Sequence, residues 1–432
     1  MKIGEIFQTI QPIPVFPVYY VRIYLPIDLT MEPMNRIVPA LLIFLFLGLS
    51  ANAQHDTMEY RHRPFQFTFL FPPLSTNGVD NVNIVNDFSL NLFIGVSGGV
   101  EVFEAGSFIN VDRYYVRGAQ LAGFGNTVGR SADGVQLAGF YNVNGTRMNG
   151  FQGAGFINVA GEDVRGAQAA GFMNIAGGRM EGFQGAGFFN IAGASGNGVQ
   201  AAGFGNVTAG RNTCFQGAGF MNVADDVTGL QAAGFINIAG KVKGVQLSGF
   251  INICDSIEGV PLGVINVVKK NGYRKLGFSV SEVQYANLSF RLGVRQLYNI
   301  FSFGKPFGPG SRWMYGGGLG TELGLTEKTT LNIEGAVHQE VWIANPATGR
   351  FLYTDRLNLY NSARFLFGWS MEDLVSLHVG PTFNVAVGHS NPDLGIEAWR
   401  EIPPYAIFNR TSRNYRGTNV QMWFGLQGEI RF

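Results

Sequence analysis

Charged side chains are scarce in this chain, and the few that are present balance one another. Asp, Glu, Lys and Arg make up 14% of the 432 residues, against roughly 25% in an ordinary soluble domain. The 31 basic residues stand against 30 acidic ones, which leaves a formal net charge of +1. Because a surface that binds nucleic acid needs an excess of positive charge, we expect no nucleic acid among the partners.

Cysteine and histidine are also rare. The two cysteines, Cys214 and Cys254, are too few for a disulfide framework or a zinc site, and the five histidines are scattered along the chain. We therefore predict neither a metal site nor a cofactor. Glycine and phenylalanine, in contrast, number 60 and 37, and both are used far more often than on average.

The N-terminal region contains an export signal. Residues 34–36 (Met-Asn-Arg) form a short positive segment, and residues 37–49 form an apolar run. Ala51 and Ala53 then supply the small side chains that signal peptidase requires before Gln54. The run is too short for a membrane helix, which needs about 20 apolar residues. We predict a signal peptide over residues 34–53 that is cleaved before Gln54.

Residues 1–33 precede this signal and match no targeting pattern. A signal peptide normally begins a chain, so we interpret this segment as an artefact of start-codon choice, with the true start at Met31 or Met34. The cleaved signal and the C-terminal features described below together predict the outer membrane of a Gram-negative bacterium.

A repeat of sixteen residues dominates residues 112–268. It reads G-x-Q-x-A-G-F-x-N-[VI]-A, as in residues 166–176. Self-similarity this strict is typical of stacked supersecondary units. Three consecutive units supply a predicted ladder of identical side chains: Gln136, Phe140, Asn142, Gln152, Phe156, Asn158, Gln168, Phe172 and Asn174.

The order inside each unit has a period of two. From Met148 to Ala160, the even positions include the Gln and Asn, and the odd positions are mostly Phe, Gly, Ile and Val. Such alternation indicates a β-strand. Residues 161–163 (Gly-Glu-Asp) then form a short turn, in which glycine allows the positive φ of a tight hairpin.

Two architectures are compatible with these units. In the first, each unit is one strand of an antiparallel barrel. In the second, each unit is one coil of a β-solenoid with stacked Gln, Phe and Asn. A strand of 13 residues spans roughly 43 Å, which three turn residues can reverse but cannot bring back to its start. A soluble solenoid would also expose a ladder of large apolar side chains. The identical Gln and Asn in every unit favour the solenoid, because only parallel stacking aligns them.

The C-terminal third also alternates, with one uniformly apolar face. The last strand places Val420, Met422, Phe424, Leu426, Gly428, Ile430 and Phe432 on one face, and Gln421, Gln427, Glu429 and Arg431 on the other. A transmembrane barrel strand has such an apolar outer face, and strands in hydrocarbon must close into a barrel. The terminal Phe432 resembles the C-terminal aromatic of bacterial outer-membrane proteins that the barrel-insertion machinery reads.

We therefore expect an all-β protein, an antiparallel transmembrane β-barrel built partly from the 16-residue strand–turn repeats. The alternative is a β-solenoid of repeats attached to a smaller C-terminal barrel. The expected organisation is N-terminal strands over 54–111, repeats over 112–268, and barrel strands over 269–432. The partners implied are outer-membrane lipid and the barrel-insertion machinery.

The repeats resemble those of bacterial surface-repeat proteins of Bacteroidetes and spirochaetes. The G-x-Q-x-A-G-F-x-N units carry the resemblance, together with residues 86–92 (NDFSLNL) and 98–101 (GGVE) before them and 285–288 (YANL) after them. It covers roughly residues 65–305. The resemblance implies a surface location and a repeat architecture, and it brings no catalytic residues.

Candidate catalytic groups are few. Ser376 and His378 share one strand face, with Asn384 nearby, as a lipase-like site would require; lumen polarity explains them as well. Four further charged residues should face the lumen, where charges pair or tune a pore: Glu334, Glu340, Arg356 and Arg364. We expect a non-enzymatic outer-membrane surface protein, structural or a passive pore. The alternative is an adhesin or a ligand-binding surface presented by a repeat solenoid.

Overall fold

The computed structural model describes residues 60–70, 72–307, 312–342, 358–371, 375–389, 405–412 and 418–432. The chain divides into two compact units, one ending at Asp225 and the other beginning at Asp226. The expected signal peptide and the segment before it lie outside the described residues. So do the predicted cleavage residues Ala51, Ala53 and Gln54.

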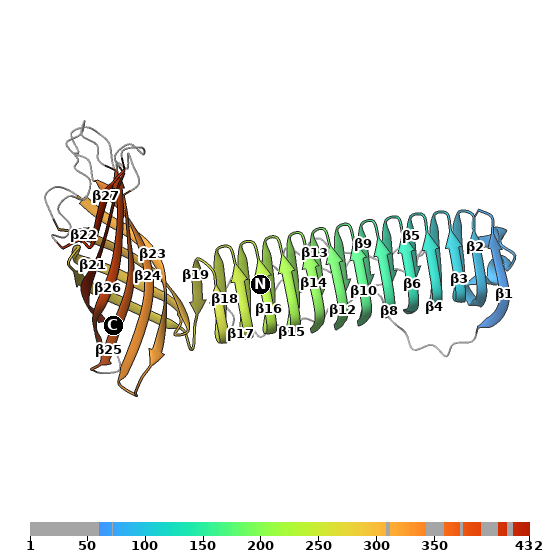
Figure 1. Ribbon diagram of the computed structural model, residues 1–432. Coiled ribbons are helices and arrows are strands. Elements are labelled where there is room, and N and C mark those ends of the chain that lie inside the picture. The colour runs from blue at the N-terminus through green and yellow to red at the C-terminus, as the bar shows by residue number, and fades with distance from the viewer. Residues whose placement is uncertain are drawn as a thin grey trace, which may run out of the picture. The chain divides into compact units, whose positions relative to one another are not determined.

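The first nineteen strands form a β-solenoid of about 12 turns, visible in Figure 1 as a row of coils. Two short 3-10 helices, η2 (Pro72–Leu74) and η3 (Gly78–Asn83), follow the first strand. The strands are β1 (Arg61–Thr68), β2 (Ile84–Asn91), β3 (Ile94–Gly106), β4 (Ile109–Ala122), β5 (Gly125–Val128), β6 (Ser131–Ala138), β7 (Tyr141–Asn144), β8 (Met148–Ala154), β9 (Ile157–Ala160), β10 (Val164–Ala170), β11 (Met173–Ala176), β12 (Met180–Ala186), β13 (Phe189–Ala192), β14 (Gly196–Ala202), β15 (Gly205–Ala218), β16 (Met221–Ala233), β17 (Ile236–Ser248), β18 (Ile251–Leu262) and β19 (Ile265–Val268).

A typical coil consists of two short strands joined by two corners. In one coil of the first unit, β8 leads into a corner at Gly155-Phe156, and β9 leads into a second corner at residues 161–163. Strand β8 pairs in parallel with β10, and β9 pairs in parallel with β11. Each residue therefore lies beside its counterpart sixteen positions further along the chain.

The expectation that the repeats are antiparallel barrel strands is wrong. The strand expected from Met148 to Ala160 is broken after Ala154, where Gly155 and Phe156 turn the chain onto the second face of the coil. The backbone stays paired through this corner, since Phe156 N–H donates to Phe140 O at 2.9 Å. Because the chain turns twice per unit, three residues at the second corner suffice to start the next parallel coil. The alternative of a solenoid with a smaller barrel is the one observed.

Most coils contain one glycine in a conformation that other residues avoid. Gly150 has φ +116°, and a Cβ on it would lie 2.1 Å from the carbonyl oxygen of Gly134 in the preceding coil. Glycines with positive φ recur at the same place in neighbouring coils, including Gly166, Gly182 and Gly198. Cys214 occupies this place opposite Gly198, with φ 101°.

The interior of the first unit is a thin layer between the two strand faces. Its apolar part is a stack of methionine, valine and alanine side chains, such as Met148, Val164 and Met180 from one face and Ala160 and Ala176 from the other. All are nearly inaccessible to solvent. The rest of the layer consists of Gln and Asn side chains, so nearly half of each coil's interior is polar and must be hydrogen bonded.

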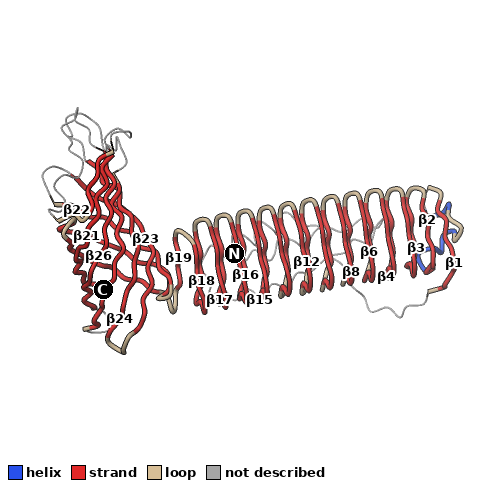
Figure 2. Tube along the Cα trace, in the orientation of Figure 1, coloured by secondary structure: helices blue, strands red, loops and turns tan. Residues whose placement is uncertain are grey.

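The C-terminal strands form a closed eight-strand antiparallel barrel, seen in Figure 2. The last strand of the chain pairs with the first strand of the barrel, which closes it. A short ninth strand pairs with the last one. The strands are β20 (Tyr273–Ser281), β21 (Gln284–Val294), β22 (Leu297–Pro306), β23 (Arg312–Gly324), β24 (Thr329–Trp342), β25 (Leu359–Ser370), β26 (Ser376–His389), β27 (Phe408–Thr411) and β28 (Thr418–Arg431).

The expected alternation of the barrel strands is confirmed. Along β28, Gln421, Gln427, Glu429 and Arg431 are buried, whereas Phe424, Leu426, Ile430 and Phe432 are exposed. Backbone hydrogen bonds join Phe432 to Leu276 of β20 in both directions, at 2.9 and 3.2 Å. The terminal residue therefore takes part in barrel closure.

We predict that Cys214→Gly stabilises the protein. The left-handed region is unfavourable for a residue with a Cβ, and relieving such strain is worth about 1 to 3 kcal/mol. Glycine's larger unfolded-state entropy removes about 0.5 to 1 kcal/mol of this gain, so the net free energy of unfolding should rise by about 1 kcal/mol. Urea unfolding of the full chain in detergent, followed by circular dichroism, measures the change.

The matched control is Cys214→Ala, which removes the thiol but keeps the Cβ and its strain. It should leave the stability nearly unchanged. Equal stabilisation by both substitutions would show that the thiol, and not the backbone conformation, is unfavourable at this position.

Candidate functional site

Two ladders of amide side chains run through the solenoid interior. One consists of the Gln of each first strand and the other of the Asn of each second strand, and both are nearly inaccessible to solvent. The nine ladder residues predicted from the sequence all lie in the first unit, where Gln and Asn are buried and Phe is exposed or half-buried at the corner. Counterparts stack in register, as Gln152 with Gln168 and Asn158 with Asn174.

The two ladders donate their hydrogen bonds in opposite directions. Gln168 Nε2 donates to Gln152 Oε1 of the preceding coil at 2.8 Å. Asn158 Nδ2 donates to Asn174 Oδ1 of the following coil at 2.9 Å. Since each amide is both donor and acceptor, every rung satisfies the next one, and the opposed amide dipoles of the two rows offset each other.

The Asn ladder also ties the two faces of the solenoid together. Asn158 lies on β9, and its Nδ2 also donates to the carbonyl oxygen of Ala169 on β10 at 2.8 Å. Asn142 makes the equivalent bond to Gly153 O at 2.9 Å. Aspartate or leucine could not make both bonds, because neither has an NH₂ group.

The Gln ladder ends toward the N-terminus in a buried pair of carboxyl groups. Glu104 stands opposite Gln120 in the ladder, and Asp112 lies beside it on β4. Gln120 Nε2 donates to both, at 2.7 Å to Glu104 Oε2 and at 2.5 Å to Asp112 Oδ2. Neither carboxyl group is more than 1% exposed. Ser97 donates to Asp112, and Ser89 donates to Glu104.

The site of this pair disfavours a negative charge on Asp112. Burial raises the pKa of the Asp112 carboxyl well above its usual range, and the neighbouring charge of Glu104 raises it further. A hydrogen bond links Asp112 and Glu104. Asp112 therefore retains its proton at pH values where an exposed aspartate has lost it.

Different residues end the ladders in the second unit. Pro261 stands opposite Gln246 and replaces the amide with an apolar ring. The Asn ladder continues one step further, because Asn266 donates to Asn299 of the barrel strand β22. Asn299 in turn donates to Gly263 O at 2.9 Å. The barrel thus supplies the last rung for the Asn ladder.

The barrel lumen is filled by a network of charged side chains. Arg291 contacts Glu334 and Glu429 at 2.9 and 2.7 Å, and Arg431 contacts the same two carboxylates at 2.7 and 2.9 Å. All four side chains are fully buried. They come from β21, β24 and β28, so their ion pairs join separate walls of the barrel. Arg364 lies 3.8 Å from Glu334.

The residues of the lipase-like candidate are only partly brought together. Ser376 Oγ lies 3.0 Å from His378 Nε2. Asn384 instead donates to Thr382 and Glu282 and accepts from Tyr360. A nucleophile–base pair needs a third group to orient the base, and His378 Nδ1 has no partner among the described residues. The arrangement fits lumen polarity better than a catalytic triad.

Of the four charged residues expected in the lumen, Glu334 belongs to the network and Arg364 lies beside it. Glu340 is also buried and pairs with Arg312 at 3.3 Å, whereas Arg356 lies outside the described residues. The sequence pattern placed Glu429 and Arg431 on the polar face of the last strand, and Arg291 on the polar face of residues 286–294. It did not show that the three side chains meet. It also missed the Glu104–Asp112 pair. Counting back sixteen residues from Gln120 would have found Glu104.

Other candidate groups are absent from the described part of the chain. There, no helix is long and apolar enough to cross a membrane, and no three His, Cys, Asp or Glu side chains gather as metal ligands would. Cys214 and Cys254 are both free. Comparison with family models, curated proteins and solved structures found no match for this chain.

We predict that the stability of the solenoid falls as the pH rises above about 4, the ordinary pKa of aspartate. Because the pKa of Asp112 is raised, its contribution is complete below that value and is lost as the pH approaches the folded-state pKa. In this window the native state holds a proton that the unfolded state has released, which costs about 1.4 kcal/mol per pH unit. Asp112→Asn should remove this slope. Urea unfolding at a series of pH values measures it.

Asp163→Asn is a control, because the pKa of Asp163 is shifted in the opposite direction and its contribution to stability changes with pH in the opposite sense. Burial alone would raise the pKa of Asp163, but hydrogen bonds from the backbone and guanidinium of Arg179 outweigh it and lower the pKa. Its contribution is therefore present at neutral pH and is lost on acidification. If Asp112→Asn left the pH slope of the wild type unchanged, the interpretation that Asp112 retains a proton in the folded state would be wrong.

Proposed function

We propose that this chain is a non-enzymatic outer-membrane surface protein, in which the barrel is a membrane anchor and the solenoid is an extended scaffold. The observation that carries the proposal is the division of side chains across the barrel wall. Apolar residues lie on the outer face, and all four members of the Arg291–Glu334–Glu429–Arg431 network lie inside. A barrel in water would need the reverse.

The outer face of the barrel has the character of a lipid-facing wall. Neighbouring strands each present exposed apolar side chains that alternate with less exposed residues, as with Phe365 and Phe367 on β25, and Leu377 and Val379 on β26. On β24, β25, β26 and β28, every described Asp, Glu, Lys and Arg is buried. Burying charges while exposing Phe and Leu is favourable only where the surroundings are hydrocarbon.

The lumen favours an anchor over a passive pore. Eight strands enclose a space that side chains can fill. Here two arginines and two glutamates bridge it with ion pairs of 2.7–2.9 Å. A permeant ion would have to break these fully buried pairs, and leaving one buried charge unpaired costs about 3 to 5 kcal/mol.

A second candidate function is a binding surface presented by the solenoid, as in an adhesin. It is favoured by a shallow groove of about 480 Å³ on the first unit, lined only by Ala, Gly and Leu. Both candidates place the barrel in the outer membrane and differ only in whether the coils recognise a ligand.

Reconstitution of the full chain into planar bilayers tests the anchor against the pore. We expect membrane insertion, seen as a heat-modifiable shift in electrophoretic mobility, without steady ionic current at neutral pH. Steady single-channel currents from the wild type would favour the pore. Failure to insert into any lipid bilayer would contradict the outer-membrane assignment itself.

We also predict that Phe432→Asp impairs assembly. Phe432 is exposed on the outer wall, its ring lies 6.1 Å from that of Phe278, and its backbone pairs with Leu276. A carboxylate at this place opposes entry into lipid, so the fraction of heat-modifiable protein in the membrane should fall. Phe432→Leu retains the apolar character and should assemble normally. Equal assembly of both variants would count against a lipid-facing terminus.

A further inference from the structure

The first unit of the solenoid has an uninterrupted apolar strip along one side, which we call the apolar edge. Its centre is the corner phenylalanine of each coil, whose rings stack at centroid distances of 4.7–5.1 Å. These rings are Phe93, Phe108, Phe124, Phe140, Phe156, Phe172, Phe188, Phe204 and Phe220. Phe140 and Phe156 remain 41% and 37% exposed despite the stacking, so their outer parts need another cover.

Two rows on the first strands of the coils complete the apolar edge. The row before each Gln is Val135, Phe151, Ala167, Phe183, Val199 and Phe215, and the row after it is Leu121, Leu137, Gly153, Ala169, Gly185, Ala201 and Gly217. A Cβ on Gly185 would lie 2.8 Å from Phe183 Cε1. The ring therefore covers the glycine two residues later, which explains why F-Q-G and x-Q-A units alternate.

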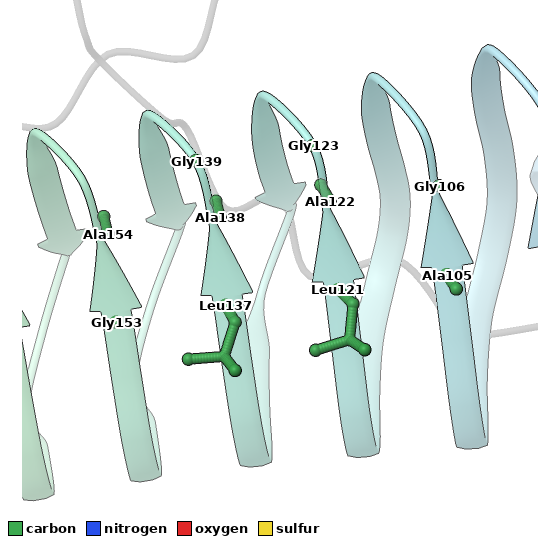
Figure 3. A pocket seen from close by; sticks show the side chains of 10 residues that line it. All are labelled: Ala105, Gly106, Leu121, Ala122, Gly123, Leu137, Ala138, Gly139, Gly153 and Ala154. Carbon is green, nitrogen blue, oxygen red and sulfur yellow. The ribbon is translucent and has the colours of Figure 1, made fainter.

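A groove lies within the apolar edge, between the row that follows each Gln and the corners of the coils. Figure 3 shows Leu121 and Leu137 projecting beside it, with Ala122, Ala138 and Ala154 near the strand ends. Its volume is about 480 Å³. No lining residue has a polar side chain, so an occupant would find no side-chain hydrogen-bond partner there.

The charged residues of these coils lie at the other corner and the strand start that follows it. Arg165 pairs with Glu181 at 3.3 Å, and Arg179 pairs with Asp163 at 2.9 Å. These pairs join neighbouring coils and remain exposed to water. Each coil thus has a charged side and an apolar side, which is the division found in elements that lie in a membrane interface.

We propose that the apolar edge binds lipid, and that its groove accommodates acyl chains of the outer membrane. The edge measures roughly 40 Å by 17 Å, from nine rungs at strand spacing and five residues of strand. An exposed apolar patch of this size exceeds the few hundred Å² usual on a soluble monomer. The proposal rests on the proposed function, because the barrel brings the solenoid to a lipid surface.

A second copy of the chain is a less suitable occupant. The area of the edge is close to the ~800 Å² that each partner of a stable dimer buries. Such interfaces also carry about ten hydrogen bonds, whereas the three rows supply no side-chain donor or acceptor. Hydrocarbon requires none. The same surface is repeated in coil after coil. Such a uniform surface suits many identical lipid acyl chains better than one folded protein partner.

Depth-dependent fluorescence quenching in proteoliposomes tests the proposal. The full chain, with Cys214→Ala and Cys254→Ala, receives one new cysteine that is labelled with the polarity-sensitive dye NBD. Phe156→Cys and Val135→Cys place the dye on the apolar edge, and Glu162→Cys places it at the opposite corner of the same coil as Phe156. Vesicles of phosphatidylcholine with brominated acyl chains act as the quencher.

We expect the dye at positions 156 and 135 to lose most of its fluorescence in brominated vesicles, and the dye at 162 to keep it. No loss at 156 and 135, with a heat-modifiable inserted barrel, would overturn the lipid proposal while leaving the anchor intact. Protection at 156 without bromine quenching, together with a disulfide cross-link between two unlabelled chains of the Phe156→Cys variant, would identify a second copy as the occupant and overturn it. A barrel that does not insert would overturn both proposals.

Discussion

The hydrogen bond between identical amides in successive coils is the constraint on which the solenoid depends. Asn158 must reach Asn174 and Gln168 must reach Gln152, which fixes the register and the direction of the coils. The ladder bonds persist where the spacing shortens to 15 and 14 residues. Parallel strands lie about 4.8 Å apart, and a primary amide spans that distance only when its counterpart projects the same way. A polar interior is normally unfavourable, but here each rung satisfies its neighbour. The ends are therefore the vulnerable places, and different residues occupy them: the Glu104–Asp112 pair, Pro261, and Asn299 of the barrel.

Much of this could be predicted from the sequence. The period of sixteen, the ladder positions Gln152, Phe156 and Asn158, and the alternation of the last strand are all read directly from the residues. The expectation that the repeats form barrel strands was wrong for one physical reason. The alternation of residues was taken to continue through Gly155-Phe156 as one strand. A glycine next to a recurring aromatic residue can equally mark a corner of a coil. Treating residues 148–160 as one straight strand made the return path too long for three residues. With a second corner the path closes, and the in-register Gln and Asn, already the best argument for the solenoid, decide the matter.

The interior of the barrel was less accessible to sequence reasoning. Alternation shows that Glu334, Glu429 and Arg431 point inward, but not which of them meet. Arg291 pairs with Glu429 across 138 positions of sequence and with Glu334 across 43. Such pairings follow from strand order, closure and stagger, none of which a local pattern contains. Asn384 illustrates the same limit, because it lies six residues from His378, roughly 20 Å along an extended strand. Residues that are neighbours in sequence on one strand face can therefore belong to separate networks.

The argument against the solenoid was that it would expose a ladder of large apolar side chains. The side chains are indeed exposed, but the repeats form a solenoid nonetheless. A stack of such coils does leave large apolar side chains outside: Phe140, Phe151, Phe156 and Phe183 are each 37–42% exposed. The ring stacking removes one part of each phenylalanine from water, and the F-Q-G units place a ring over a glycine, yet the outer ring edges remain. The barrel and the coils therefore share one feature, since each has an exposed apolar face and keeps its charged residues elsewhere. The barrel turns its apolar face outward, as the proposed membrane anchor requires, and the coils keep their charges away from the apolar edge. An apolar face maintained through nine rungs is unfavourable in water, and that cost is the reason for proposing that the face lies against lipid.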